Sequence, residues 1–195
     1  MSEFNTYFKD REYKLSKFRS VIPIDTVSFC NLKSSMCITK DSKAEKGFMD
    51  WDLYTKIIDE IALKNKDAMV FMAFRGEPMV RSRFKPDIFE MIKYAKNKGL
   101  TKVVMNSNGC LLTEENSRKL LESGLDQIFI GIDAFSEDVY VKNRCGGNYK
   151  QTVKNVLKLL ELKKKMKLEK PIIECQFIEM DNNIHQRQAF IDFWT

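Results

Sequence analysis

The chain has 195 residues, 44% of them hydrophobic and 31% charged, with a formal net charge of +6 at pH 7, which is ordinary for one globular domain with a full hydrophobic core. No apolar run is long enough to span a membrane and the N-terminus lacks a signal-peptide pattern, so we expect a cytoplasmic protein with no membrane partner. Five cysteines, an odd number, argue against a disulfide framework and leave thiols for metal binding, chemistry or packing.

Strands and helices are predicted to alternate along a core domain over residues 23–195, after a docked N-terminal extension over residues 1–22. The strands are near-continuous apolar runs, predicted at Ile24–Phe29, Ala68–Phe74, Lys102–Asn106, Gln127–Ile132 and Ile172–Ile178. Helices are predicted at Trp51–Lys64, Pro86–Lys98, Glu114–Ser123 and Tyr149–Lys167, with a last one from near Asn183 to the C-terminus. Such strands are typical of parallel sheets buried on both faces, so the fold class is α/β, an open sheet or a partial (β/α) barrel.

Helix ends and faces are also predicted from the sequence. Leu53, Ile57 and Ile61 recur at four-residue spacing and predict the buried stripe of their helix. Pro86 suits the first turn of a helix, and Thr113 before two glutamates suits an N-cap.

Polar residues and glycines gather where the predicted strands end. They are the loop Ser28–Cys37, the segments Arg75–Pro78 and Asn106–Cys110, Asp133 with the loop Arg144–Gly147, and Glu174 with Gln176. In parallel sheets and barrels, ligands bind at the carboxyl ends of the strands. Loops are polar in any case, which explains part of the pattern. The part of the pattern that loop polarity does not explain predicts a pocket for a charged, hydrogen-bonding ligand.

The loop after the first strand resembles the radical S-adenosylmethionine (radical SAM) superfamily. Cys30 and Cys37 stand seven apart, with Asn-Leu-Lys after the first and Met36 before the second. That family carries Cys-x3-Cys-x2-Cys, whose thiolates hold three irons of a [4Fe–4S] cluster while the fourth iron binds S-adenosylmethionine. The resemblance implies both cofactors, with Cys30, Ser34 and Cys37 at the metal. Ser34 occupies the middle position, where a neutral hydroxyl is a poorer iron ligand than a thiolate.

Further segments extend the resemblance over residues 24–195. Gly76-Glu77-Pro78 resembles the family's Gly-Glu-Pro segment, which receives the methionine ammonium, and Arg144 matches an arginine that suits a ligand carboxylate. Gly131 stands where the family commonly has a serine. The resemblance implies S-adenosylmethionine binding by Met36, Gly76, Glu77, Pro78, Asn106, Asn108, Asp133, Arg144 and Gln176. No catalytic acid or base is assigned.

Three explanations of Ser34 remain open at this point. It is a substitution in an otherwise active enzyme, a natural loss that leaves a cluster-free domain, or a position compensated by another thiol, Cys110 or Cys145. Cys175 is expected in the core and His185 on the surface. The segments Gly47–Asp50 and Leu111–Asn116 resemble the branch with C-terminal cluster-binding extensions, called SPASM proteins.

The resemblance implies an enzyme that cleaves S-adenosylmethionine reductively to a 5′-deoxyadenosyl radical, which abstracts hydrogen from an unknown peptide, sugar or small metabolite, with an electron donor as partner. The family barrel has six strands, so the sequence is expected to be truncated after its fifth strand and the following helix. The alternative is a cluster-deficient, catalytically silent ligand-binding or interaction domain. An RNA-modifying role predicts salt-sensitive RNA affinity, and the modest charge argues against a nucleic-acid partner.

Overall fold

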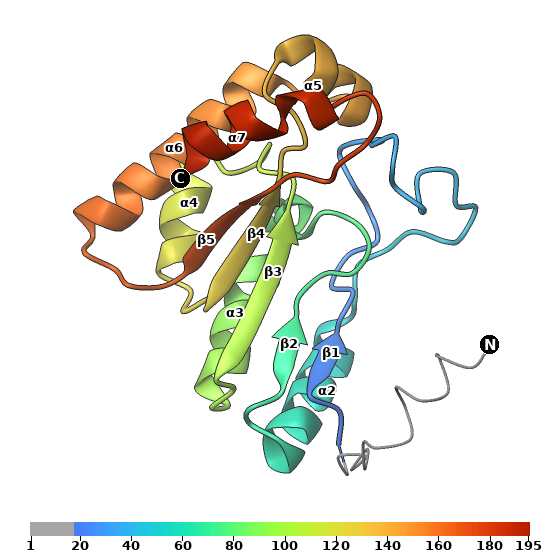
Figure 1. The fold of residues 1–195 in the computed structure, drawn as a ribbon. Helices are drawn as coiled ribbons and strands as arrows, with labels where there is room; N and C mark the ends of the chain where they lie inside the picture. Colours follow the sequence, from blue (N-terminus) through green and yellow to red (C-terminus); the bar gives the residue numbers. More distant parts are fainter. Residues whose placement is uncertain (1–17) are drawn as a thin grey trace, which may run out of the picture.

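A computed structural model describes residues 18–195 and shows one parallel sheet with helices packed against it (Figure 1). The strands lie in the order β1 (Val21–Pro23), β2 (Met69–Phe71), β3 (Lys102–Ser107), β4 (Gln127–Gly131) and β5 (Ile172–Gln176), each parallel to its neighbour. The helices are α2 (Trp51–Lys64), η1 (Pro78–Arg83), α3 (Ile88–Asn97), α4 (Glu114–Leu121), α5 (Glu137–Asn143), α6 (Tyr149–Lys165), η2 (Ile184–Gln186) and α7 (Arg187–Trp194). The predicted α/β class with five parallel strands is confirmed.

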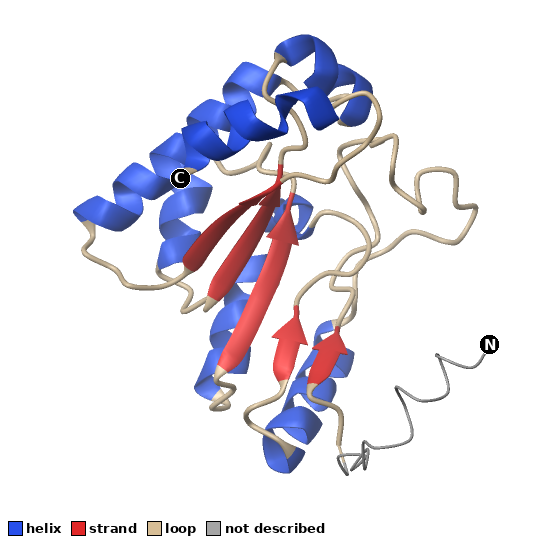
Figure 2. Cartoon of the chain, in the orientation of Figure 1, coloured by secondary structure: helices blue, strands red, loops and turns tan. Residues whose placement is uncertain are grey.

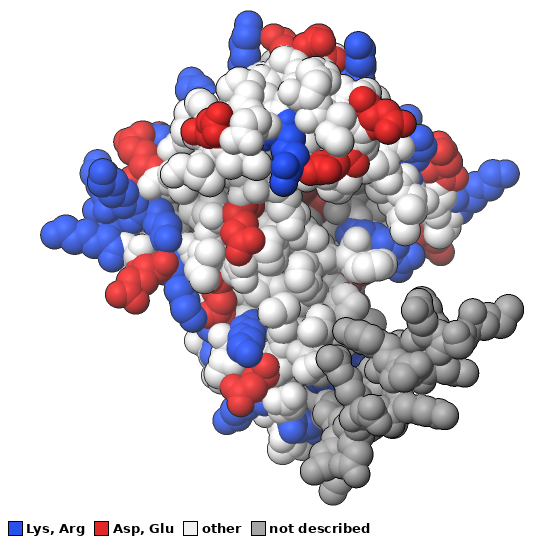
Figure 3. All heavy atoms as spheres, in the orientation of Figure 1, with Lys and Arg blue, Asp and Glu red and all other residues white. Residues whose placement is uncertain are grey.

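One face of the sheet is buried under helices and the other is partly open. In β4, Ile128 and Ile130 are fully buried, whereas Phe129 between them is partly exposed. The Phe129 ring stacks on that of Phe71 across β3, at 5.9 Å between centroids. Figure 2 shows helices behind the sheet with strands toward the viewer, and Figure 3 shows a largely uncharged surface there. The expectation that the strands are buried on both faces is therefore wrong for this face within residues 18–195.

The predicted position of the first strand is wrong. Strand β1 ends at Pro23, and only the Ile24 N–H continues its pairing, donating to the Phe71 carbonyl at 2.7 Å. Farther on, Val27 is buried and forms a single antiparallel bridge with Phe48. The apolar run Ile24–Phe29 thus reports burial rather than strand pairing. Strand β1 includes two residues of the expected N-terminal extension, residues 1–17 lie outside the described part, and the domain division stays a prediction.

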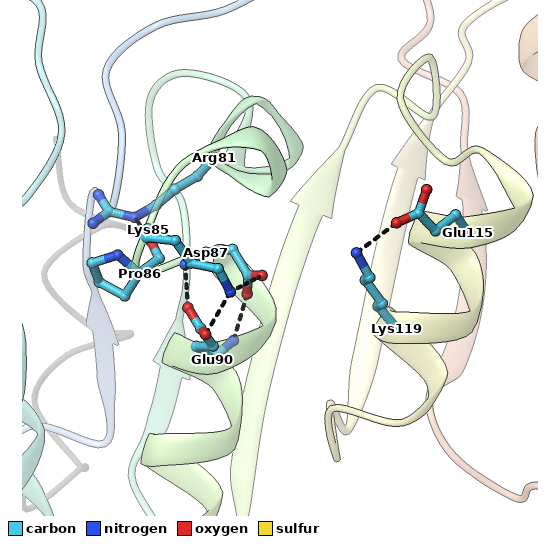
Figure 4. Close-up of polar contacts among 7 residues, drawn as sticks. All are labelled: Arg81, Lys85, Pro86, Asp87, Glu90, Glu115 and Lys119. Atoms are coloured by element: carbon cyan, nitrogen blue, oxygen red, sulfur yellow. Dashed lines mark hydrogen bonds and ion pairs between the residues drawn. The ribbon is translucent and has the colours of Figure 1, made fainter.

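Helix starts follow capping chemistry more closely than the apolar pattern does. Asp87 caps α3, because its carboxylate accepts the Glu90 N–H at 2.8 Å while the Glu90 carboxylate accepts the Asp87 N–H at 2.8 Å (Figure 4). Pro86 therefore precedes the helix instead of lying in its first turn.

Helix α2 has its predicted bounds, but its buried face differs from the predicted stripe. Leu53 is 50% exposed, and the buried side chains are Tyr54, Ile58, Ile61 and Ala62.

No helix of the described chain is long and apolar enough to cross a membrane.

Asp126, just before β4, joins three elements at the amino end of the sheet. Its carboxylate, 8% exposed as a residue, accepts hydrogen bonds from Lys96 Nζ and Lys170 Nζ, both at 2.6 Å, and from the Val103 N–H at 2.8 Å. Burial alone raises the pKa of this carboxyl, but the two ammonium groups and the backbone N–H outweigh it and lower the pKa.

We expect Asp126→Asn to lower the free energy of unfolding by about 1–3 kcal/mol at pH 7, because the amide leaves the partly buried Lys96 ammonium, and the exposed Lys170 ammonium beside it, without their counter-charge. The folded pKa lies below the unfolded value of about 3.9, so the contribution is present above that pH and is lost as the pH falls through the folded pKa. Urea unfolding at pH 7 and near pH 3 measures this. The exposed Asp181→Asn is the control, and an equal loss at both pH values contradicts the charge argument.

Candidate functional site

A cavity of about 230 Å³ opens at the carboxyl ends of the strands. It brings together most of the residues predicted from the sequence, namely Cys30, Ser34, Met36, Cys37, Gly76, Glu77, Asn106, Asn108, Arg144 and Gln176. Five lining residues were not among those predicted to bind: Phe74, Ser107, Phe129, Gly131 and Ile178. The strand-end rule had a signal for Ser107, which lies in the segment after the third strand. Gly131 also had a signal, since it stands where the family commonly has a serine. Phe74, Phe129 and Ile178 had none, because apolar residues at strand ends resemble core residues.

The cysteine loop is fixed by backbone contacts with the last residue of α5 and the segment that follows it. The Lys33 N–H donates to the Cys145 carbonyl and the Ser35 N–H to the Asn143 carbonyl, both at 2.9 Å. A turn brings the Cys37 N–H to the Ser34 carbonyl at 3.0 Å. These bonds hold both thiols at the wall of the cavity.

The environment of Cys30 favours a neutral thiol in the absence of a metal. Burial raises the pKa of the Cys30 thiol, and the charges of Glu77 and Cys37 act in the same direction. Its sulfur accepts the Leu32 N–H at 3.4 Å. Since a metal ligand must be the thiolate, metal binding here would release a proton.

The donor set falls one thiolate short of a three-cysteine cluster loop. Cys30 and Cys37 line the cavity with Ser34, which is 7% exposed, and residues 18–195 hold no group of three or more His, Cys, Asp or Glu that suits a metal. As it stands, this set does not fit a [4Fe–4S] cluster held by three thiolates.

The other cysteines are used elsewhere. Cys110 Sγ lies 3.6 Å from the Tyr140 hydroxyl, and Cys145 Sγ donates to the Lys142 carbonyl at 3.2 Å. Neither lines the cavity, so the structure gives no support to compensation by either thiol among the described residues. Cys175 is half-buried in β5, where burial raises the pKa of its thiol to about 12, and the histidine of η2 is exposed. The histidine matches its expected place, whereas Cys175 packs against the core instead of lying fully within it.

The Glu77 carboxylate is almost completely enclosed and accepts three hydrogen bonds. The donors are the Asn108 N–H at 2.7 Å, Ser107 Oγ at 2.9 Å and the Met79 N–H at 3.1 Å. Burial raises the pKa of Glu77, and these three bonds oppose that rise. Its first role in the structure is to join the segment after β2 to the end of β3. Receipt of a ligand ammonium stays a prediction.

The two neighbours of Glu77 have backbone roles. Gly76 has φ +71°, and a Cβ there would lie 2.4 Å from the Val27 carbonyl oxygen and 2.7 Å from that of Phe29. Only glycine permits this crossing of two backbone segments. Pro78 is buried as the first residue of η1 and does not line the described cavity.

Asp133 supports the cavity from behind rather than lining it. It is fully buried with φ +58°, its carboxylate pairs with Arg144 Nη2, and it also accepts the Ile178 N–H at 2.7 Å. Its carbonyl accepts from the buried Asn183 amide at 2.9 Å. Asn183 was not predicted as a site residue. Asp133 thus positions Arg144, which is itself in the cavity wall.

Comparison with known proteins shows the family to which the sequence is related. The family model of the Radical SAM superfamily matches residues 24–172. The chain is 28% identical over 165 residues to the tungsten-containing aldehyde ferredoxin oxidoreductase cofactor-modifying protein of Pyrococcus furiosus, covering 84% of this chain and 44% of that protein. It is 28% identical over 165 residues to a probable GTP 3′,8-cyclase of Methanococcus maripaludis, covering 84% of this chain and 51% of that protein. The chain spans about half the length of these relatives.

The fold is similar to that of Streptococcus suis SuiB bound to S-adenosylmethionine, with a TM-score of 0.72 and 14% identity over 90% of this chain and 38% of that chain. This likeness confirms the fold, a partial barrel of parallel strands. The matched family segment includes the cysteine loop, Glu77 and Arg144, which meet in one cavity. The chain therefore belongs to the Radical SAM superfamily.

Proposed function

We propose that the cavity binds S-adenosylmethionine and that the chain is the core of a radical SAM enzyme. One observation carries this proposal: the cysteine loop, Arg144 and several amide side chains, which lie far apart in the sequence, line a single cavity at the carboxyl ends of the strands. The similar fold of SuiB, described as bound to S-adenosylmethionine, supports it. The chemistry implied is reductive cleavage of S-adenosylmethionine to a 5′-deoxyadenosyl radical that abstracts hydrogen from a substrate.

Several parts of S-adenosylmethionine would find a chemical partner in the cavity. The Arg144 guanidinium suits the carboxylate, and Met36 offers an apolar surface beside the metal site. Asn106, Asn108 and Gln176 supply amide donors and acceptors for the ribose and adenine. The iron ligands would be Cys30 and Cys37, with the Ser34 hydroxyl in the third place.

Partners beyond the cofactors stay proposals. An electron donor is implied by the reductive chemistry. The names of the relatives include a cofactor-modifying protein and a GTP cyclase, and SuiB is described with a precursor peptide, so the substrate class is open. We also propose that the chain belongs to the SPASM branch, on the resemblance of Gly47–Asp50 and Leu111–Asn116.

The proposal is tested by purifying the chain without oxygen and measuring S-adenosylmethionine binding by equilibrium dialysis, before and after treatment with iron and sulfide. Dithionite is then added and 5′-deoxyadenosine is quantified. We expect saturable binding that Arg144→Ala weakens. Because the donor set is one thiolate short, we expect 5′-deoxyadenosine mainly from the iron-treated Ser34→Cys variant, and little from the unaltered chain. A folded, iron-treated chain that binds no S-adenosylmethionine contradicts the proposal.

A second function is favoured by Ser34 alone. A chain that binds S-adenosylmethionine with two thiols and a hydroxyl at the metal position is suited to a cluster-free ligand-binding or interaction domain. Such a domain would bind S-adenosylmethionine equally with and without iron and would form no 5′-deoxyadenosine. Ser34→Cys would increase neither its iron content nor its product formation.

A further inference from the structure

We propose that the absence of a side chain at Gly131 determines where the Arg144 guanidinium lies on the cavity wall. There it is in position to bind a ligand carboxylate, and we call Gly131 and Arg144 the steric pair. The inference rests on the proposed function in one respect, namely that the carboxylate is that of S-adenosylmethionine. Gly131 then acts as a positioning residue through Arg144.

The space above Gly131 is occupied by the guanidinium of Arg144. A Cβ at position 131 would lie 2.1 Å from Arg144 Nη2, 3.1 Å from Cζ and 3.5 Å from Nη1. The φ of Gly131 is outside the left-handed region, so the backbone itself does not require glycine there. The three heavy atoms nearest to such a Cβ all belong to this guanidinium, so it is the first group that a side chain would have to displace.

Arg144 is anchored at both of its ends. Its backbone N–H donates to the Tyr140 carbonyl at 2.7 Å, and its carbonyl accepts the Gly147 N–H at 2.9 Å, which fixes the Cα at the end of α5. The side chain then reaches back across β4 to the buried Asp133 carboxylate. With its Cα fixed and its guanidinium paired with Asp133, the side chain can avoid an added Cβ only by distorting or breaking that pair.

Most of the hydrogen-bonding capacity of Arg144 is left for a ligand. Arginine has five N–H donors, and within residues 18–195 this side chain has one hydrogen-bond acceptor, the Asp133 carboxylate. Arg144 Nε is buried without a partner, and the side chain, 14% exposed, lines the cavity. A carboxylate satisfies such a fork bidentately. At the position where the family commonly has a serine, this chain has Gly131, and the Arg144 guanidinium occupies the space above it.

A double-mutant cycle tests the pair: Gly131→Ala, Arg144→Ala and the combination, each measured for S-adenosylmethionine binding by equilibrium dialysis. We expect Gly131→Ala and Arg144→Ala each to weaken binding by about tenfold or more, the size of one lost charge-assisted bond. In the Arg144→Ala background, Gly131→Ala should add less than about twofold, since nothing remains to be displaced. A full additional loss would mean that Gly131 makes room for the ligand itself, and would overturn the proposal. Gly47→Ala is the matched control, because a Cβ at Gly47 meets no atom within 4 Å.

Urea unfolding of the same variants without ligand separates this inference from the proposed function. Gly131→Ala should lower the unfolding midpoint in the wild-type background by breaking the Arg144–Asp133 pair, and should have little effect after Arg144→Ala. If the wild-type chain binds no S-adenosylmethionine, the proposed function fails while this cycle still decides the pairing. If Gly131→Ala does not fold, as judged by circular dichroism, the double variant is expected to fold, and its failure to do so overturns the pair.

Discussion

Replacing Ser34 with cysteine is expected to convert a chain that loses iron readily into one that retains a [4Fe–4S] cluster. The Ser34 side chain is almost fully buried and lines the same cavity as Cys30 and Cys37, so a thiol there adds the third sulfur with one atom exchanged. Substitution of residues that hydrogen-bond to metal ligands changes metal affinity by roughly 10–100-fold. Adding a direct ligand should therefore raise the affinity for the cluster by at least about 100-fold. Iron and sulfide per chain after anaerobic reconstitution and gel filtration, with the absorption spectrum, measure the effect.

The neighbouring residue supplies a matched control. Ser35 belongs to the same loop but is exposed and does not line the described cavity, so Ser35→Cys adds a thiol without adding a ligand. We expect Ser35→Cys to hold no more iron than the wild-type chain. Equal, stoichiometric retention by the wild-type chain and Ser34→Cys would show that a third thiolate is not needed. Iron loss from Ser34→Cys would show that the loop does not hold a cluster.

The sequence predicted the arrangement of the fold well because its strongest signals are local. Helix α2 has its predicted bounds, since Asp50 accepts the Asp52 N–H at 2.8 Å and an apolar period follows. Strand β4 is within one residue of its prediction for a similar reason, a continuous apolar run. The first strand was misplaced because hydrophobicity reports burial, and Ile24 and Val27 are buried without belonging to a strand.

The residues of the site could be predicted because parallel strands bring their carboxyl ends to one edge of the sheet. What each side chain does there depends on partners that are distant in sequence. Glu77 faces Ser107 and Asn108 rather than open space, and Arg144 occupies the space above Gly131. A sequence motif identifies a site residue, but the contacts that this residue makes are known only from the packed structure.

Glu77→Gln is expected to lower the free energy of unfolding by about 2–3 kcal/mol in the absence of any ligand. A glutamine amide has one carbonyl oxygen, whereas the Glu77 carboxylate accepts the Asn108 and Met79 N–H groups on different oxygens. The Ser107 hydroxyl can rotate to accept a hydrogen bond, but a backbone N–H cannot. In either orientation of the amide, one buried N–H therefore loses its acceptor. Urea unfolding at pH 7 measures the loss.

The same variant decides whether Glu77 serves the fold or the ligand. The control is Glu60→Gln in α2, whose side chain is 57% exposed and pairs with Lys64, and which should change stability by less than about 0.5 kcal/mol. If Glu77→Gln unfolds like the wild-type chain but binds S-adenosylmethionine more weakly, the carboxylate acts on the ligand, and its connection of β2 to β3 is energetically minor. If stability falls and binding by the folded fraction is retained, Glu77 is a structural residue that holds Asn108 and Ser107 at the cavity. The three donors already directed at its oxygens favour the second result.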